Sequence, residues 1–186
     1  MKIIAGVDEV GRGSLVGPVL AAAVILNKSI KKKLLKDSKK LSKTQREILF
    51  KYIKKNSIWA TGKASVKEIE KMNILQASLL AMKRAIKNLD KKPNLILVDG
   101  NKLPKMLGYK LKSIIKGDQK IPSISAASIV AKVTRDKLIT KLGKKFKGYY
   151  WDKNMGYGTK IHLKAIKTLG ITNEHRKSFA PINKLK

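Results

Sequence analysis

The sequence predicts an α/β fold in which a mixed five-stranded sheet is flanked by helices. Short apolar runs rich in Val, Ile, Leu and Ala are interspersed with longer segments that have apolar residues at helical spacing. No repeat or low-complexity linker divides the 186 residues. We therefore expect a single domain over residues 1–186, in which about 145–186 form a small helical C-terminal extension.

Five apolar runs have the length and composition of buried strands. The clearest is Asn94 to Val98, because a Leu-Ile-Leu-Val run is closed by Asp99-Gly100. The second run is rich in Val, Ile and Ala, which suits a strand that is covered on both faces. The expected strands are residues 2–8, 18–26, 57–64, 94–98 and 109–115.

Four segments have the features of helices. Residues 31–56 are helical in pattern and very basic, with a break near Asp37-Ser38. Ser65 to Glu68 fits a capping box, which begins a long amphipathic helix that reaches about Asn88. A helix rich in small residues is expected over about 123–142, and another from Lys160 to near Gly170. The order of three strands, helix, strand, strand and helix favours a mixed sheet with helices on its faces.

The formal charge of +31 predicts a polyanionic partner, and nucleic acid is favoured over membrane because there is no long apolar span or lipidation motif. Only five of the 43 basic residues are Arg, so a compositional bias toward Lys is an alternative explanation. The absence of Cys suits a reducing compartment. Residues 14–26 do not form a signal peptide, since Asp8 and Glu9 precede them and Pro18 interrupts them. We expect a cytoplasmic protein.

Acidic residues stand at the ends of three apolar segments: Asp8 and Glu9, Asp99, and Asp118. Taken singly, each has an ordinary explanation as a turn, a helix cap or a hydrogen-bonded strand end. If the three ends converge, the four carboxylates need hard divalent cations to neutralise them. Two such ions about 4 Å apart can cleave a phosphodiester in line. Asp8 and Glu9 are consecutive, so both reach one site only if the strand ends or twists there, which Gly11 permits.

The remaining polar and aromatic residues have mainly structural interpretations. His162 and His175 lack the spacing of a zinc site. Asp136 is expected to pair with Arg135 or a neighbouring lysine. Trp59 and Trp151 are expected to be packing residues, although Tyr149, Tyr150 and Trp151 could instead flank a nucleic-acid groove near Tyr157.

Eight short motifs, in this order along nearly the whole chain, resemble those of type 2 ribonuclease H, the ribonuclease HII family. The related ribonuclease HIII family shares the acids but departs at the glycine loop. The motifs are Asp8-Glu9-Val10-Gly11-Arg12-Gly13, Gly17-Pro18-Val19, Asp37-Ser38-Lys39-Lys40-Leu41, Val98-Asp99-Gly100, Lys116-Gly117-Asp118, Ser125 to Val133, Gly156-Tyr157-Gly158-Thr159 and His175-Arg176-Lys177-Ser178-Phe179.

The resemblance implies an RNase H-like fold and hydrolysis of the RNA strand of RNA/DNA hybrids. It also implies nicking 5′ to single ribonucleotides embedded in duplex DNA, which leaves 3′-hydroxyl and 5′-phosphate ends and serves ribonucleotide removal. By position, two Mg²⁺ or Mn²⁺ ions would be held by four acids: Asp8, Glu9, Asp99 and Asp118.

The resemblance also assigns residues to substrate recognition. Gly11, Arg12 and Gly13 match the loop whose backbone reads the 2′-hydroxyl, the group that distinguishes RNA from DNA. Tyr157 matches a tyrosine that stacks on the following deoxyribose.

Lys39 and Lys40, beside the predicted break at Asp37-Ser38, could hold a substrate phosphate or could be an ordinary solvated face. A different class of function, a catalytically silent basic protein that binds nucleic acid, would satisfy the charge alone. The acids at three strand ends favour the enzyme. We expect it to act as a monomer on hybrids and on duplex DNA with embedded ribonucleotides.

Overall fold

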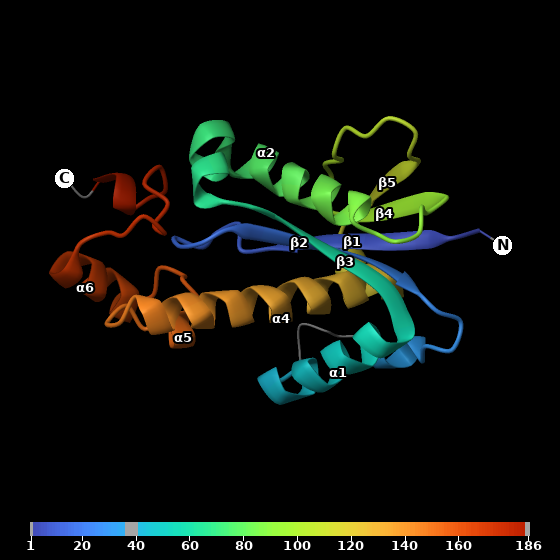
Figure 1. Cartoon of the computed structure of the whole chain (residues 1–186), viewed down its shortest axis with the longest axis horizontal. Coiled ribbons are helices and arrows are strands. Elements are labelled where there is room, and N and C mark those ends of the chain that lie inside the picture. Colours follow the sequence, from blue (N-terminus) through green and yellow to red (C-terminus); the bar gives the residue numbers. More distant parts are fainter. Residues whose placement is uncertain (1, 36–40, 185–186) are drawn as a thin grey trace.

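The computed structural model describes residues 2–35 and 41–184, which form a five-stranded sheet covered by helices (Figure 1). The strand order across the sheet is β3-β2-β1-β4-β5. The strands are β1 (Ile4–Val10), β2 (Val19–Leu26), β3 (Ser57–Ala64), β4 (Leu95–Asp99) and β5 (Leu111–Ile114).

The sheet is mixed, as predicted. β1 runs antiparallel to β2 and β2 antiparallel to β3, whereas β1 pairs with β4 and β4 with β5 in parallel. The carboxyl ends of the three parallel strands therefore meet at one edge of the sheet, where ligands are commonly bound in α/β folds.

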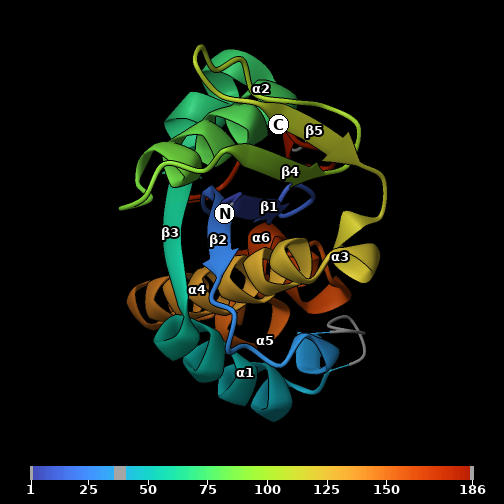
Figure 2. The ribbon, with the colours of Figure 1, turned by 90° about the vertical axis from the view of Figure 1, so that its right-hand side faces the viewer.

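Two layers of helix enclose the sheet. Figures 1 and 2 show α2 on one face and α4 on the other, with α1 packed outside α4 and the last helices at one end of the molecule. The described residues also include the short 3-10 helices η1 (Lys32–Leu35) and η3 (Ile182–Lys184). The α-helices are α1 (Lys43–Asn56), α2 (Val66–Lys87), α3 (Gly117–Lys120), α4 (Pro122–Lys145), α5 (Trp151–Asn154) and α6 (Lys160–Leu169).

Small residues in the strands allow the two long helices to approach the sheet closely. A side chain at Gly6 of β1 would collide with the backbone of Ser123, at the start of α4. A side chain at Gly62 of β3 would collide in the same way with the Ala81 carbonyl of α2. Between them lies β2, whose three consecutive alanines are fully buried. The backbones of α4 and α2 therefore pack directly against the backbone of the sheet, one on each face.

The C-terminal extension packs on the far end of α4 through a separate apolar cluster. Its centre is Trp151, which is fully buried, as predicted, and stacks on Tyr149 with ring centroids 5.1 Å apart. Leu15 and Val16, from the loop after β1, belong to the same cluster. The extension is therefore built directly onto the segment that follows the first strand.

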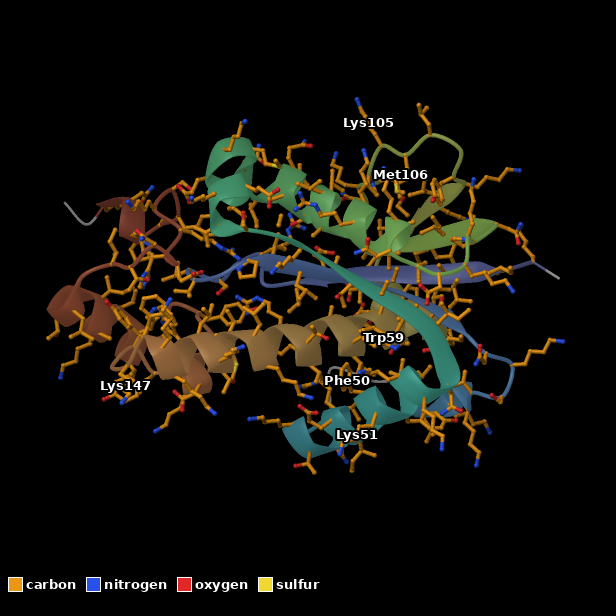
Figure 3. All side chains as sticks on the ribbon, in the orientation of Figure 1. Phe50, Lys51, Trp59, Lys105, Met106 and Lys147 are labelled. Carbon is orange, nitrogen blue, oxygen red and sulfur yellow. The ribbon has the colours of Figure 1, made fainter. Side chains whose placement is uncertain are left out.

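The other tryptophan, Trp59, lies in β3 and is partly buried against Phe50 of α1 (Figure 3). Their rings meet edge to face with centroids 6.5 Å apart. Each of the two tryptophans therefore packs in an apolar cluster, which confirms that prediction.

The capping box at the start of α2 is confirmed, since Ser65 and Glu68 make the reciprocal hydrogen bonds. The helix is not continuous, however, because Asn73 adopts a left-handed φ of 69°. Its side-chain oxygen accepts from the backbone N–H groups of Leu75 and Gln76, at 3.0 and 3.1 Å. Asn73 therefore caps a second helical segment after the kink.

Several strand and helix boundaries differ from the sequence-based expectations. β1 does not end at Asp8, because its pairing with β2 continues to Val10 opposite Leu20. β4 includes Asp99, and Asp118 lies in a short helix, α3, that the apolar pattern does not indicate. The basic segment 31–56 is divided into η1 and α1; its expected break, with Lys39 and Lys40, lies outside the described residues.

Candidate active site

Asp8 and Asp99 lie side by side on two adjacent parallel strands. The register pairs Val7 of β1 with Val98 of β4, which brings the following residue of each strand to the same edge of the sheet. Asp8 is 6% exposed, and the backbone N–H of Glu9 donates to its Oδ1 at 2.7 Å. Sheet pairing alone therefore joins two of the four predicted carboxylates.

Asp118 is tied to the same edge through its preceding residue. After β5 the chain turns at Lys116, whose φ is 55°, and enters α3. The backbone N–H of Gly117 then donates to Asp99 Oδ1 at 2.6 Å. Asp118 follows at once and is 3% exposed. Asp8 and Asp99 thus lie together at this edge, and Asp118 directly follows the residue that donates to Asp99.

The electrostatics of this edge show a concentration of negative charge. Burial raises the pKa of Asp8 well above its usual range, and the charges of Glu9 and Asp99 raise it further. A hydrogen bond from the Ser128 hydroxyl of α4 acts in the opposite direction. Burial also raises the pKa of Glu9, and the Arg12 guanidinium partly offsets this.

Glu9 points to the opposite face of the sheet from Asp8, as consecutive strand residues do. It pairs with Arg12, with 3.3 Å between Glu9 Oε1 and Arg12 Nη1. Both line a groove of about 300 Å³ that also includes Asp99 and Lys102. Because β1 continues to Val10, the expected strand end at Asp8 is wrong. Glu9 therefore approaches Asp99 from the groove, on the other face of the strand from Asp8.

The four acids fit divalent ions by the chemistry of their donors. Carboxylate oxygens are the ligands that Mg²⁺ and Mn²⁺ prefer, and a cation would relieve the repulsion that raises the pKa of Asp8. Within residues 2–35 and 41–184, no three Asp, Glu or His side chains are already gathered around one point suitable for a metal.

The glycine loop follows β1 directly and is supported from beneath by two buried arginines. Gly11 has a φ of 90°, and a side chain there would strike the guanidinium of Arg135. Arg176 Nη1 donates to the Arg12 carbonyl at 2.9 Å. Nothing lies within 4 Å of the place that a Gly13 side chain would occupy. The loop is firmly held on its inner side and open on its outer side.

The Tyr157 segment is joined to this loop by hydrogen bonds. The Gly156 carbonyl accepts from Leu15 N–H at 2.9 Å and from the Ser14 hydroxyl at 3.0 Å. The Tyr157 ring is partly exposed, and its centroid lies 5.7 Å from Arg135 Cζ. The structure thus brings Tyr157 beside Gly11, although nearly the whole chain separates them.

Below Tyr157 lies a buried pair of histidines. His162 Nδ1 donates to the Tyr157 carbonyl at 2.9 Å, so its Nε2 is the acceptor for Trp151 Nε1–H, also at 2.9 Å. His175 Nε2 lies 3.3 Å from His162 Nε2, and its Nδ1 accepts from Thr172 N–H. Each ring is therefore neutral in this arrangement, and both serve to support the loop.

Several residues that shape the site are not among those predicted from the sequence. Ser128 contacts Asp8, Lys102 lines the groove, and Ser14, Arg135 and Arg176 hold the glycine loop. Only Ser128 and Arg176 lie in motifs that carry the family resemblance, and the resemblance assigns them no role. The predicted pairing of Asp136 with a neighbouring lysine is confirmed, since Lys132 Nζ lies 2.9 Å from its Oδ1.

A mixed sheet with acids at the adjoining ends of its parallel strands defines the chain as a protein of the RNase H-like fold. The family model for ribonuclease HII matches residues 5–182. The chain belongs to the ribonuclease HII family, and it is therefore an endoribonuclease of the ribonuclease H type.

Relatives and solved structures agree with this assignment. The chain is 74% identical to ribonuclease HII of Pelagibacter ubique (strain HTCC1062) over 185 residues, which cover 100% of both chains. It is 52% identical to ribonuclease HII of Rickettsia prowazekii (strain Madrid E), over 95% of this chain and 91% of that one.

Solved structures share the fold of this chain. The crystal structure of ribonuclease H2 from Pyrococcus horikoshii OT3 matches with a TM-score of 0.78 and 31% identity, over 97% of this chain and 95% of that one. Bst-RNase HIII shares the fold at a TM-score of 0.70 and 16% identity, over 98% of this chain and 68% of that one. In the described part of the chain, every helix is too short or too polar to span a membrane.

Proposed function

We propose that this enzyme nicks duplex DNA 5′ to a single embedded ribonucleotide and hydrolyses the RNA strand of RNA/DNA hybrids. Both reactions leave 3′-hydroxyl and 5′-phosphate ends, and the first would serve ribonucleotide removal from DNA. The observation that carries the proposal is the adjacency of Asp8 and Asp99 on parallel strands, directly before the glycine loop.

In this proposal the four acids hold two divalent ions, Mg²⁺ or Mn²⁺. The ions would activate the attacking water and stabilise the leaving 3′-oxygen. Asp8 and Asp99 lie side by side on β1 and β4, and Glu9 lines a groove together with Asp99. Asp118 follows Gly117, whose N–H donates to Asp99. Ser128 orients the Asp8 carboxylate through its hydroxyl.

Recognition of the ribose falls to the glycine loop and Tyr157. The open outer side of Gly11-Arg12-Gly13 lets main-chain groups approach a 2′-hydroxyl, as the bare Gly13 position allows. The Tyr157 ring would stack on the next deoxyribose. Arg12, which is half-exposed beside Glu9, would contact the scissile region of the backbone. Lys39 and Lys40, outside the described residues, stay proposed phosphate contacts.

The decisive experiment uses a DNA duplex with one ribonucleotide, with Mg²⁺ or Mn²⁺ present, and maps the cleavage position. We expect one nick 5′ to the ribonucleotide, and a loss of at least about 100-fold in rate for Asp8→Asn and Asp99→Asn with duplex binding retained. Asp90→Asn, at an exposed carboxylate beyond α2, is the matched control and should cleave normally.

If the wild-type protein binds this duplex but does not cut it with either metal, the proposed reaction is wrong. If the enzyme cleaves only long hybrids, the proposed hydrolysis of the RNA strand stands, but the proposed recognition of a single ribonucleotide is wrong.

The proposal extends to the organisation of the protein. The C-terminal extension, about 145–186, contributes Tyr157 and so forms part of the substrate-binding surface. We propose that the protein acts in the cytoplasm, which the absence of Cys suits, and that it acts there as a monomer. Light scattering with and without the duplex would measure its mass.

A further inference from the structure

Arg135 is a buried cation whose contacts differ from those of an ordinary ion pair. It lies on α4 and is 0% exposed. In the described part of the chain, its three hydrogen bonds all go to main-chain carbonyls: Val16 at 3.0 Å, Pro18 at 3.2 Å and Met155 at 3.1 Å. The first two acceptors belong to the segment after the glycine loop, and the third stands two residues before Tyr157.

A guanidinium suits this position better than an ammonium group. Its planar fork can direct hydrogen bonds to several fixed carbonyls at once, whereas lysine offers one flexible point charge. Burying a charge is costly, and burial lowers the pKa of Arg135 accordingly. An arginine is placed here in a chain in which only five of the 43 basic residues are Arg.

The two candidate recognition elements touch the Arg135 side chain directly. A Cβ on Gly11 would lie 2.1 Å from Arg135 Nε, so the loop can rest on the guanidinium only because residue 11 is glycine. On the other side, the Tyr157 ring centroid lies 5.7 Å from Arg135 Cζ. The guanidinium therefore contacts both elements.

Ser14 makes a second, smaller tie between the same two segments. It is fully buried, and its hydroxyl lies 3.0 Å from both the Val16 carbonyl and the Gly156 carbonyl. Ser14 and Arg135 thus meet at Val16 and reach the Tyr157 segment at Gly156 and Met155 respectively.

We propose that Arg135, assisted by Ser14, is a positioning residue that fixes the distance between the glycine loop and Tyr157 and so determines selectivity for a ribonucleotide followed by DNA. The inference rests on the proposed function, because it assigns these two elements to ribose recognition. Arg135 touches no substrate and acts only through the loops that it holds together.

The test is a double-mutant cycle on the one-ribonucleotide duplex. Arg135→Lys should lower kcat/KM about tenfold or more, because small displacements of positioned groups have large effects on rate. Adding Arg135→Lys to Tyr157→Ala should cause little further loss, since both changes remove the same contact. Cleavage of a long RNA/DNA hybrid, which contains few RNA-to-DNA junctions, should fall less.

Two further variants distinguish the proposed positioning role from a simple loss of folding. Ser14→Ala removes one hydroxyl and should give the same substrate pattern with a smaller loss, about threefold. Arg84→Lys is the matched control, because Arg84 makes a forked contact with Glu68 away from both loops. It should leave the ratio of kcat/KM on the one-ribonucleotide duplex to that on the long hybrid within about twofold of the wild-type ratio.

Equal losses of kcat/KM on both substrates for Arg135→Lys and Ser14→Ala would overturn the proposal. It would also be overturned if the fold-loss of the Arg135→Lys/Tyr157→Ala double variant equalled the product of the two single fold-losses. A failure of the proposed function gives a different result, because the wild-type enzyme itself would then leave the one-ribonucleotide duplex uncut.

Discussion

Asp8 is held in an unfavourable state when no cation is bound. It is buried, and the charges of Glu9 and Asp99 add to the cost of ionising it. The fold nevertheless places it there, because the parallel pairing of β1 with β4 brings Asp8 beside Asp99. Strain of this kind at a site is usually relieved by the ligand for which the site is built.

Neutralising Asp8 should therefore stabilise the protein when metal is absent. Asp8→Asn keeps one oxygen acceptor, for Glu9 N–H, while it removes the charge, and we expect Tm to rise by about 2–4 °C in EDTA. The wild type should gain Tm when Mg²⁺ or Mn²⁺ is added, and the variant should gain much less. Calorimetry measures both effects.

Glu68→Gln is the matched control for this experiment. Hydrogen bonds from Arg84 lower the pKa of Glu68 to about 2, so its charge is stabilising. Its neutralisation should lower Tm or leave it unchanged. A fall in Tm for Asp8→Asn in EDTA would contradict the account of the acidic edge.

The histidine pair makes the C-terminal extension sensitive to acid. Burial, with a contribution from His162, lowers the pKa of His175 to about 4, whereas an unfolded histidine titrates near 6.5. Between these values the unfolded chain binds the additional proton, so stability falls as the pH falls from about 6.5 to about 4.

Replacing His175 should weaken this dependence. The variant His175→Gln retains an amide that can donate to His162 Nε2 but does not titrate. We expect the free energy of unfolding of the wild type to lose up to about 1.4 kcal/mol more per pH unit than the variant over this range. Urea titrations at several pH values measure the difference, and parallel curves would refute the prediction.

At the scale of the elements, glycines determine how closely α2 and α4 approach the sheet. Gly6 lies beneath the first turn of α4, and Gly62 lies beneath the C-terminal part of α2. Both contacts involve backbone atoms, which cannot rotate aside as a flexible side chain can. The position of α4, and with it that of Ser128 and Arg135, therefore depends on the absence of one side chain in β1.

Gly6→Ala and Gly62→Ala should each lower the free energy of unfolding by about 1–3 kcal/mol, because the added methyl group overlaps the helix backbone. Gly6→Ala should also reduce cleavage, since it displaces α4 from Asp8. Chemical denaturation and cleavage rates measure the two effects. Gly13→Ala is the control for stability, because open space surrounds that position, and it should leave unfolding unchanged.

The elements themselves were largely predictable from the sequence, because apolar periodicity reflects burial. Strand β3, the capping box of α2 and helix α6 agree with their predicted residues within about one position. The kink at Asn73 and the short helix α3 were not predictable. Each depends on a single left-handed residue, Asn73 or Lys116, whose conformation leaves no periodic signal.

At the scale of the whole molecule, the positive charge is spread over every visible side. Lys51 of α1, Lys105 after β4 and Lys147 after α4 project in different directions (Figure 3). Three of the five arginines behave otherwise, since Arg84, Arg135 and Arg176 each make two or more hydrogen bonds. Lysine thus contributes a general positive potential, and these arginines contribute hydrogen bonds of defined geometry.

Only lysines near the acidic edge should then contribute to specific binding. Lys102→Ala, in the groove beside Glu9 and Asp99, should reduce the slope of log Kd against log salt by about one unit. Lys51→Ala, on the outer helix α1, should leave the slope unchanged. Titration of the one-ribonucleotide duplex without divalent ions measures both, and equal slopes for the two variants would contradict this division.

The candidate site was predictable to the extent that its residues are unusual in the sequence. Four acids at the ends of apolar runs stand out in so basic a chain. Ser14, Arg135 and Arg176 do not, because their importance comes from the carbonyls that surround them, and these are brought together only by folding.

Helix α4 reaches from one half of the candidate site to the other. Ser128, which contacts Asp8, and Arg135, beneath Gly11, are separated by seven residues, which is two helical turns or about 10 Å. The spacing between the acidic edge and the glycine loop is thus set by the rise of a single helix. Under the proposed function, this fixed spacing would determine which phosphate beside the ribonucleotide is cleaved.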